Sequence, residues 1–121
     1  MKEREGGGNE LVRDAQAYME AHSAEKFSLR GMADALFVNG SYLLRAFRRH
    51  TGMTPLHYHH LIRCEKAREL LAHTDLSVSE IGETVGFVSS SHFTHVFGSV
   101  TGCTPSEYRR LHRGEREREE P

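Results

Sequence analysis

The spacing of apolar residues along the chain predicts a run of short helices. Over residues 78–85 the apolar side chains fall at i, i+3 and i+7, which places them on one face of a helix. Ser77 and Glu80 can form a capping box at its start, and Gly86 supplies the conformation that ends it. Ser89 is placed to cap a second helix, whose apolar stripe consists of Phe93, Val96, Phe97 and Val100. Two short helices joined by a few residues form a helix-turn-helix unit.

The same pattern occurs twice along the chain, 50 residues apart. Eleven of the 27 positions from 37 to 63 carry the residue that is found 50 positions later, whereas composition alone would produce ~2 such identities. Two copies at this period indicate a duplicated helix-turn-helix unit and not a solenoid. The first-copy members of the identical pairs are Phe37, Val38, Ser41, Phe47, Thr51, Gly52, Thr54, Pro55, Tyr58, Leu61 and Arg63.

Capping residues and prolines predict where the remaining helices begin. Asn9, Ser28 and Asn39 each precede an apolar helical pattern and can accept a hydrogen bond from a first-turn N–H. Pro55 and Pro105 suit the first turn of a helix, where no N–H is needed. The predicted helices run from Asn9 to about His22, from Leu29 to about Leu36, over 40–51, from Pro55 to about Ala72, and from Pro105 to about His112.

These elements predict an all-α fold of about seven helices. They would form two helix-turn-helix subdomains, each homeodomain-like, joined by a long linker helix. A linker of ~17 residues would be ~25 Å long and would set the distance between the two subdomains. The predicted organisation is a disordered segment or linker remnant at 1–8, a first helix-turn-helix unit at 9–55, the linker helix at 56–72, a second unit at 73–113 and a disordered charged tail at 114–121.

The charge of the chain is close to zero overall but is unevenly distributed. The formal net charge is −1 and the sequence pI is about 6.8, whereas a DNA-binding domain is usually basic. Residues 27–74 nevertheless carry seven Lys and Arg against three acidic residues, and residues 75–113 carry three Arg against four acidic residues. We therefore expect the first half of the chain to dominate any affinity for a nucleic acid.

Composition and motifs also limit the cellular compartment that we expect for this chain and the classes of reaction that it could catalyse. No run of residues approaches the length of about 18 apolar positions that spans a membrane, and the N-terminus lacks the apolar segment of a secretory signal. Cys64 and Cys103 lack the C-x-x-C spacing of a zinc ribbon or a redox motif, which favours a reducing cytoplasm. No Ser/His/Asp grouping, glycine-rich phosphate loop or carboxylate pair stands at catalytic spacing. The sequence therefore predicts no enzyme and no cofactor.

The residues of the repeat resemble a known family motif. In the second half the matching residues are Ile81, Val85, Gly86, Phe87, Ser91, Phe93, Phe97, Gly102, Thr104, Pro105, Tyr108 and Arg109. Upstream they are Ala33, Ser41, Tyr42, Leu43, Phe47, Gly52, Arg63, Ala67, Leu70 and Leu71. Over about residues 9–113 the chain resembles the DNA-binding region of the AraC/XylS family of bacterial transcription regulators.

This resemblance implies that the chain controls transcription by binding specific sequences of double-stranded DNA, at the bacterial nucleoid in the cytoplasm. Two recognition helices, at about 40–50 and 90–100, would enter adjacent major-groove segments on one face of the duplex. That arrangement requires a separation near one helical turn, ~34 Å.

The outer face of the first recognition helix carries the predicted DNA-binding residues of the first unit. Arg45 is the best candidate for contacting a base, because a guanidinium can bond O6 and N7 of guanine together. Leu44 offers an apolar contact for a thymine methyl group, and Ser41 is the third member of this group. Arg48 and Arg49 lie one turn further on and suit phosphates.

The second recognition helix departs from what the family usually shows. Family members commonly carry an Arg at the position of His95 and a Lys or Arg near positions 98 and 99, where this chain has Gly98 and Ser99. Hydroxyl groups bond base edges with little discrimination and release no counterions, so this helix should bind weakly. Its predicted DNA-binding residues are Ser90, Ser91, Thr94 and His95.

Two alternative functions come from other classes. His57, His60 and Cys64 stand at i, i+3 and i+7, share a helix face and could hold zinc as a metal-responsive switch, although no fourth ligand is evident. The chain could instead be a protein-interaction module in which only the first unit contacts DNA bases and the second unit docks on RNA polymerase or on another regulator. No helix shows the sustained heptads of a pairing surface, so we expect this chain to be a monomer.

Overall fold

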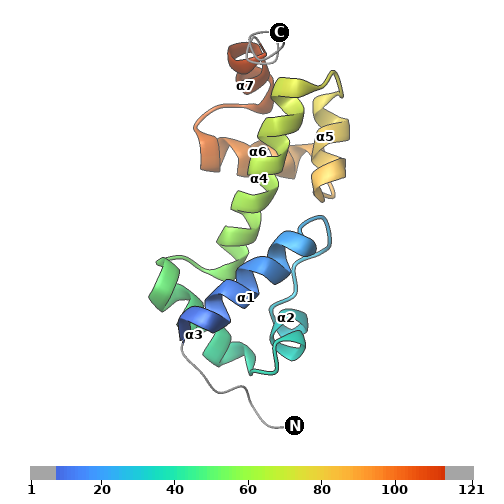
Figure 1. Ribbon diagram of the computed structural model, residues 1–121. Coiled ribbons are helices and arrows are strands. Elements are labelled where there is room, and N and C mark those ends of the chain that lie inside the picture. Colours follow the sequence, from blue (N-terminus) through green and yellow to red (C-terminus); the bar gives the residue numbers. More distant parts are fainter. Residues whose placement is uncertain (1–7, 114–121) are drawn as a thin grey trace, which may run out of the picture. The chain divides into compact units, whose positions relative to one another are not determined.

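The computed structural model describes residues 8–113, and over that range the chain forms seven α-helices and no strand (Figure 1). The helices are α1 (Gly8–Ala21), α2 (Leu29–Ala35), α3 (Gly40–Thr51), α4 (Pro55–His73), α5 (Val78–Val85), α6 (Ser90–Thr101) and α7 (Pro105–His112). The predicted all-α fold class is therefore confirmed.

The ends of the chain differ in part from the prediction. Gly8 is the first residue of α1, so Asn9 lies inside this helix and does not cap it, and the predicted disordered segment cannot include Gly8. Residues 1–7 and the predicted charged tail at 114–121 lie outside the described residues.

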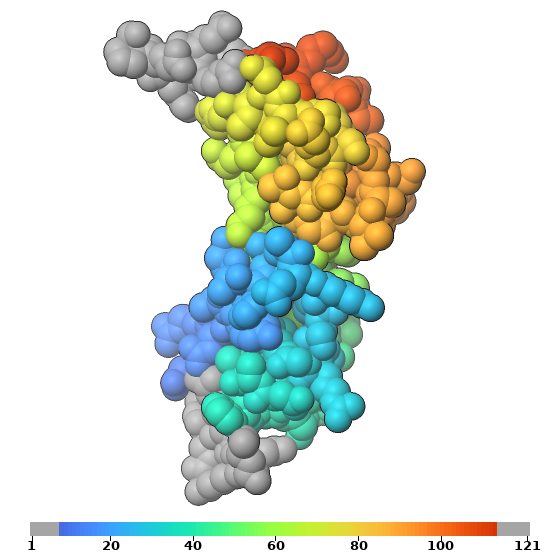
Figure 2. Space-filling view, turned by 90° about the vertical axis from the view of Figure 1, so that its right-hand side faces the viewer, coloured from blue at the N-terminus to red at the C-terminus, as the bar shows by residue number. Residues whose placement is uncertain are grey.

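The chain divides into two compact units, and the boundary lies within α4. Unit 1 extends to His60 and unit 2 begins at Leu61. In unit 1, α1 packs against α2 and α3, and Figure 2 shows one side of this packing, with α1 in blue and the α2–α3 segment in cyan to green. The largest fully buried side chains of unit 1 are Met19, Met32, Leu43, Phe47 and Pro55.

The core of unit 2 contains a chain of aromatic rings. Phe87, Phe93 and Phe97 are buried, and consecutive ring centroids lie 5.3 and 5.7 Å apart. Tyr108 of α7 extends the chain, with its ring 5.6 Å from that of Phe97. The remaining buried members of this core are Cys64, Ala67, Leu71, Ile81, Val85 and Val96.

The sequence repeat is present as a structural repeat at the end of each recognition helix. The Thr51 hydroxyl donates to the carbonyl of Phe47, and the Thr101 hydroxyl donates to that of Phe97, both at 2.7 Å. The glycine that follows each threonine adopts the left-handed conformation, with φ of 78° at Gly52 and 85° at position 102. The two helix ends are therefore built in the same way.

The turns inside the two helix-turn-helix units differ by one residue. In each turn one residue adopts the left-handed conformation: Phe37 in unit 1, with φ of 61°, and Gly86 in unit 2, with φ of 113°. Phe37 lies two residues before Asn39, the cap of α3, whereas Gly86 lies three residues before Ser89, the cap of α6. The turn of unit 2 is therefore one residue longer.

This extra residue changes which member of the repeated Phe-Val dipeptide is buried. In unit 1 Phe37 is 54% exposed and Val38 is 7% exposed, whereas in unit 2 Phe87 is 4% exposed and Val88 is fully exposed. The alignment of Phe37 with Phe87 and of Val38 with Val88, at a shift of 50, is therefore wrong as a structural equivalence. Val38 and Phe87 occupy the same place, because each directly follows the left-handed residue and packs into its core.

Candidate DNA-binding interface

The outer face of α3 gathers the residues that the sequence predicts for the first unit. Asn39 caps the helix by accepting a hydrogen bond of 2.7 Å from the N–H of Tyr42, and the left-handed Gly52 ends it. Its buried side is formed by Leu43, Ala46 and Phe47. The opposite side therefore presents Ser41, Leu44, Arg45, Arg48 and Arg49, of which all but the half-buried Leu44 are exposed.

Two hollows lie beside this face, one on each side of α3. The hollow toward α2 has a volume of about 460 Å³ and is lined in part by Ser41 and Leu44. The hollow toward α1 has a volume of about 340 Å³ and is lined in part by Arg45 and Arg49. Four of the five predicted DNA-binding residues of α3 thus lie on its two flanks, and Arg48 lines neither hollow.

The arginines of α3 are not engaged by the rest of the fold. Within residues 8–113, the guanidinium groups of Arg45, Arg48 and Arg49 form no hydrogen bond or ion pair with another residue. All three side chains are exposed. Their charge is therefore available to an external anion such as a DNA phosphate.

The outer face of α6 has a different chemistry. Ser89 caps the helix through a hydrogen bond of 3.1 Å from the N–H of His92, and Phe93, Val96 and Phe97 form its buried side. The opposite side presents Ser90, Ser91, Thr94 and His95, of which Thr94 is half-buried and the others are exposed. The helix-turn-helix formed by α5 and α6 contains two Glu and no Lys or Arg.

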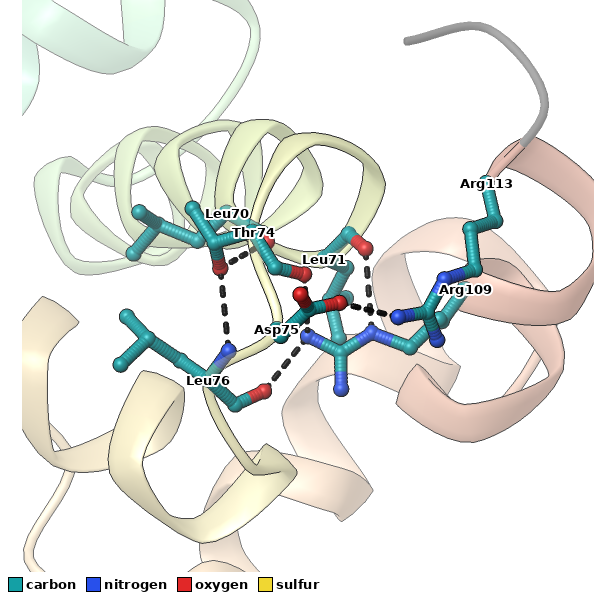
Figure 3. Close-up of polar contacts among 7 residues, drawn as sticks. All are labelled: Leu70, Leu71, Thr74, Asp75, Leu76, Arg109 and Arg113. Carbon is teal, nitrogen blue, oxygen red and sulfur yellow. Dashed lines mark hydrogen bonds and ion pairs between the residues drawn. The ribbon is translucent and has the colours of Figure 1, made fainter. Parts of the chain in front are cut away.

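Most arginines of unit 2 instead have partners within their own unit, as Figure 3 shows for Arg109, and only Arg110 among the described ones is exposed without a hydrogen bond or ion pair. The Nε–H of Arg109 donates to the carbonyl of Leu71 at 3.1 Å, and its terminal NH₂ donates to the carbonyls of Thr74 and Leu76 at 3.2 and 2.6 Å. These acceptors lie at the end of α4 and just after it, where carbonyls have no partner within the helix. Arg109 therefore joins α7 to the C-terminal end of α4.

Three further arginines of unit 2 have partners inside the unit. Arg113 forms an ion pair with Asp75, which Figure 3 also shows. Arg68 pairs with Glu65 at 2.9 Å. The guanidinium of the buried Arg63 lies 5.2 Å from the centre of the Phe87 ring, and burial lowers the pKa of this group. The count of charges along the sequence does not reveal these partners, because all but Glu65 are distant in sequence.

The candidate metal ligands are not brought together. His57 is exposed, His60 is half-buried, and Cys64 is only 1% exposed. Burial raises the pKa of the Cys64 thiol to about 11, so the thiolate that binds zinc is disfavoured at neutral pH. Between residues 8 and 113, no group of three or more His, Cys, Asp or Glu residues is placed to hold a metal ion.

Among the described residues, no helix is both long enough and apolar enough to cross a membrane. The longest helix, α4, has 19 residues, of which several are charged or histidine.

Comparison with known proteins supports the helix-turn-helix assignment. A family model described as a helix-turn-helix domain matches residues 32–111. The HTH-type transcriptional activator RhaS of Enterobacter sp. (strain 638) is 42% identical over 71 residues, which are 59% of this chain and 26% of RhaS. The chain thus spans about a quarter of the length of this curated relative.

Solved structures share the fold over most of the chain. A transcriptional regulator with an AraC-type DNA-binding domain, from Chromobacterium violaceum, matches with a TM-score of 0.82 and 31% identity, over 88% of this chain and 95% of that one. The DNA-binding domain of the global transcriptional factor AdpA, solved in complex with a target DNA, matches with a TM-score of 0.80 and 28% identity, over 88% and 96% of the two chains.

Proposed function

Because this chain belongs to the AraC-type family of helix-turn-helix DNA-binding domains, we propose that it binds double-stranded DNA at specific sequences and thereby regulates transcription in the bacterial cytoplasm. The observation that carries this proposal is the outer face of α3, where three arginines are exposed and have no partner among the described residues. The similarity to RhaS, a transcriptional activator, and to AdpA, solved with a target DNA, supports it.

The chemistry of α3 suits direct contact with bases. Arg45 can donate two hydrogen bonds to O6 and N7 of one guanine, which is the most common specific contact in the major groove. Leu44, half-buried at the edge of the same face, can contact the methyl group of a thymine. The hydroxyl of Ser41 can bond a base edge near the start of the helix, the end that enters the groove most deeply.

In this proposal Arg48 and Arg49 hold the sugar-phosphate backbone of the DNA. They lie in the last turn of α3, away from the end that enters the groove. A phosphate contact there would fix the position of the helix and add affinity without selecting a sequence. Each phosphate that is neutralised also releases counterions, which makes the affinity depend on salt.

Unit 2 contributes less affinity in this proposal. Its candidate residues are three hydroxyl side chains and a histidine, namely Ser90, Ser91, Thr94 and His95. None of them carries a permanent positive charge, so α6 would add little counterion release. It would add a weak sequence preference beside the site that α3 occupies.

A selection experiment tests the proposal. The chain would select duplexes from a random library at about 50 mM salt, and the survivors would be selected again at about 200 mM. A recovered motif whose affinity falls steeply with salt would support the proposal. Failure to enrich any sequence at the lower salt concentration would contradict it. Two half-sites about ten base pairs apart would show that both units contact bases, and a single short half-site would restrict this role to unit 1.

A second candidate function concerns unit 2 alone. The α5–α6 pair has acidic residues at Glu80 and Glu83, and the apolar Val88 in its turn is fully exposed. Such a surface suits a basic patch on a protein partner, such as RNA polymerase or another regulator, better than it suits DNA. In that case the chain would bind a single half-site as a monomer, and Glu83→Gln would weaken binding to RNA polymerase without changing affinity for DNA.

A further inference from the structure

The hollow on the α2 side of the recognition helix contains a positive charge that lies outside the set of predicted DNA-binding residues. This hollow is lined by residues of α2, of the turn and of α3, among them Arg30, Ser41 and Leu44. Arg30 is the second residue of α2 and is exposed. It therefore shares one surface depression with two residues that we assign to base contacts.

Nothing in the described part of the fold engages this charge. Arg30 forms no hydrogen bond or ion pair with another residue between 8 and 113. Asp34 lies one helical turn further along α2 and lines the same hollow, but no ion pair joins the two. An arginine that is neither packed nor paired is available to an external ligand.

The geometry of a duplex explains why such a charge would be needed on this side. A helix in the major groove, which is about 12 Å wide, lies between two sugar-phosphate backbones. On the α1 side of α3, the hollow is lined by Arg45 and Arg49. On the α2 side, Arg30 is the only Lys or Arg among the residues that line the hollow. The two flanks of α3 are thus each supplied with a guanidinium group.

We infer that Arg30 binds a backbone phosphate on the α2 side of the groove, opposite the phosphate held by Arg49. This inference rests on the proposed function, because it presumes that α3 enters the major groove. A guanidinium can hold a phosphate through two parallel hydrogen bonds, which would fix the angle at which α2 crosses the backbone. The carboxylate of Asp34 repels a phosphate, so the contact is confined to the Arg30 end of the hollow.

The described part of unit 2 has no counterpart of this contact. The caps Ser28 and Ser77 occupy the same place at the start of α2 and α5, so the residue equivalent to Arg30 is Ser79. A serine hydroxyl can bond a phosphate but neutralises no charge. The inferred contact is therefore a property of unit 1 and would help to explain a dominance of unit 1 in DNA affinity.

Neutral phosphates placed in the DNA test the inference directly. The probe is a duplex that the chain itself selects from a random library, prepared as a set in which one phosphate at a time is replaced by an uncharged methylphosphonate. Affinities would be measured for the natural chain, Arg30→Ala, Arg30→Lys, Arg49→Ala and Arg13→Ala. Arg13 is an exposed arginine of α1 that lines neither hollow and serves as the matched control.

We expect the affinity to depend on two different phosphates, one through Arg30 and the other through Arg49. One methylphosphonate should weaken binding of the natural chain about tenfold but leave the affinity of Arg30→Ala unchanged. A second methylphosphonate, on the opposite strand, should leave the affinity of Arg49→Ala unchanged. Arg30→Lys should recover part of the loss, and Arg13→Ala should match the natural chain at every position.

Two other results would have different meanings. If the natural chain selects no duplex, the proposed function fails and the contact fails with it. If the natural chain binds its duplex but Arg30→Ala remains sensitive to every methylphosphonate, the inference about Arg30 is overturned while the proposed function stands. Circular dichroism of Arg30→Ala would establish that its helices are intact.

Discussion

The arginines of unit 1 and unit 2 serve different purposes, although both units contain the same helix-turn-helix. In unit 1, Arg45, Arg48 and Arg49 extend from the outer face of α3 and have no partner among residues 8–113. In unit 2, Arg109 donates to three backbone carbonyls and Arg113 pairs with Asp75. The charge of these unit 1 arginines is therefore available to an external ligand, whereas Arg109 and Arg113 join α7 to the end of α4 and the residues after it.

This difference shows why net charge is a poor guide to nucleic-acid binding. The chain as a whole has a formal charge of −1, which taken alone argues against a DNA ligand. Affinity for DNA depends on the cations that can reach phosphates, and an arginine held by carbonyls or a carboxylate is not one of them. Counted in this way, the α2–α3 region is strongly basic, while the α5–α6 region has no permanent cation at all.

The largest expected effect comes from removing the internal arginine of unit 2. Arg109→Ala should lower the free energy of unfolding by about 3 kcal/mol, because three carbonyls lose a charged donor. Arg45→Ala, at an exposed position that has no partner among residues 8–113, should change it by less than about 0.5 kcal/mol. Urea denaturation of both variants provides the comparison. Equal losses would show that the arginines of the two units are not used differently.

The next effect concerns DNA affinity, which substitutions in unit 1 should lower more than substitutions in unit 2. Arg45→Ala should cost ~1–3 kcal/mol of binding free energy and relax the preference at one base pair, whereas Arg48→Ala should weaken all sequences alike. His95→Ala, at the corresponding position of α6, should cost much less because no permanent charge is lost. Titrations on the selected duplex and on its single-base variants measure all three. A loss for Arg45→Ala that is equal on every sequence would exclude a base contact.

Packing between the helices of each helix-turn-helix also differs, and this leads to a smaller effect. A Cβ atom at Gly82 would lie 2.7 Å from the ring of Phe93. In unit 1 the equivalent positions hold Ala33 and Leu43, both buried. The bulkier ring on α6 therefore requires the smaller residue on α5, which explains why a helix tolerates a glycine there.

Substitution at this contact would test the size complementarity. Gly82→Ala should destabilise the protein by about 1–2 kcal/mol, because the clash exceeds the gain in helix propensity. Gly82→Ala combined with Phe93→Leu should lose less than the sum of the two single changes. Gly98→Ala is the matched control, since its added Cβ would meet nothing closer than 3.9 Å, and it should be stabilising. Additive losses in the double variant would count against the pairing.

Sequence-based prediction works for features that depend on residues close together in the sequence and not for contacts between distant residues. The bounds of α3 and α7 agree with the prediction because caps, prolines and glycines act within a single turn. The partners of Arg109 lie 33 to 38 residues away, so no local pattern could show that this arginine is internal. Arg109 matches the family motif, but the motif alone does not indicate its structural role.

The turns show a second limit of the same kind. Identical Phe-Val pairs at a constant spacing suggested equivalent positions, yet the left-handed residue is Phe37 in one turn and Gly86 in the other. A one-residue difference in turn length is invisible when the flanking repeat, from Ser41 to Tyr58, keeps its spacing. Only the backbone conformation shows which residue of each pair enters the core.

The smallest expected effect comes from the left-handed residue of the first turn. A side chain in this conformation costs about 1–2 kcal/mol, and Phe37 bears this cost although the residue is 54% exposed. Phe37→Gly should remove the strain, although the greater flexibility of glycine in the unfolded chain offsets about half of the gain. Thermal unfolding should therefore show a rise of a few degrees for Phe37→Gly, and none for Phe37→Ala, which keeps the strain. Should Phe37→Gly instead lower the melting temperature, the exposed ring would have to stabilise unit 1 by more than the strain costs. The turn of unit 1 would then be as well adapted as the glycine-containing turn of unit 2.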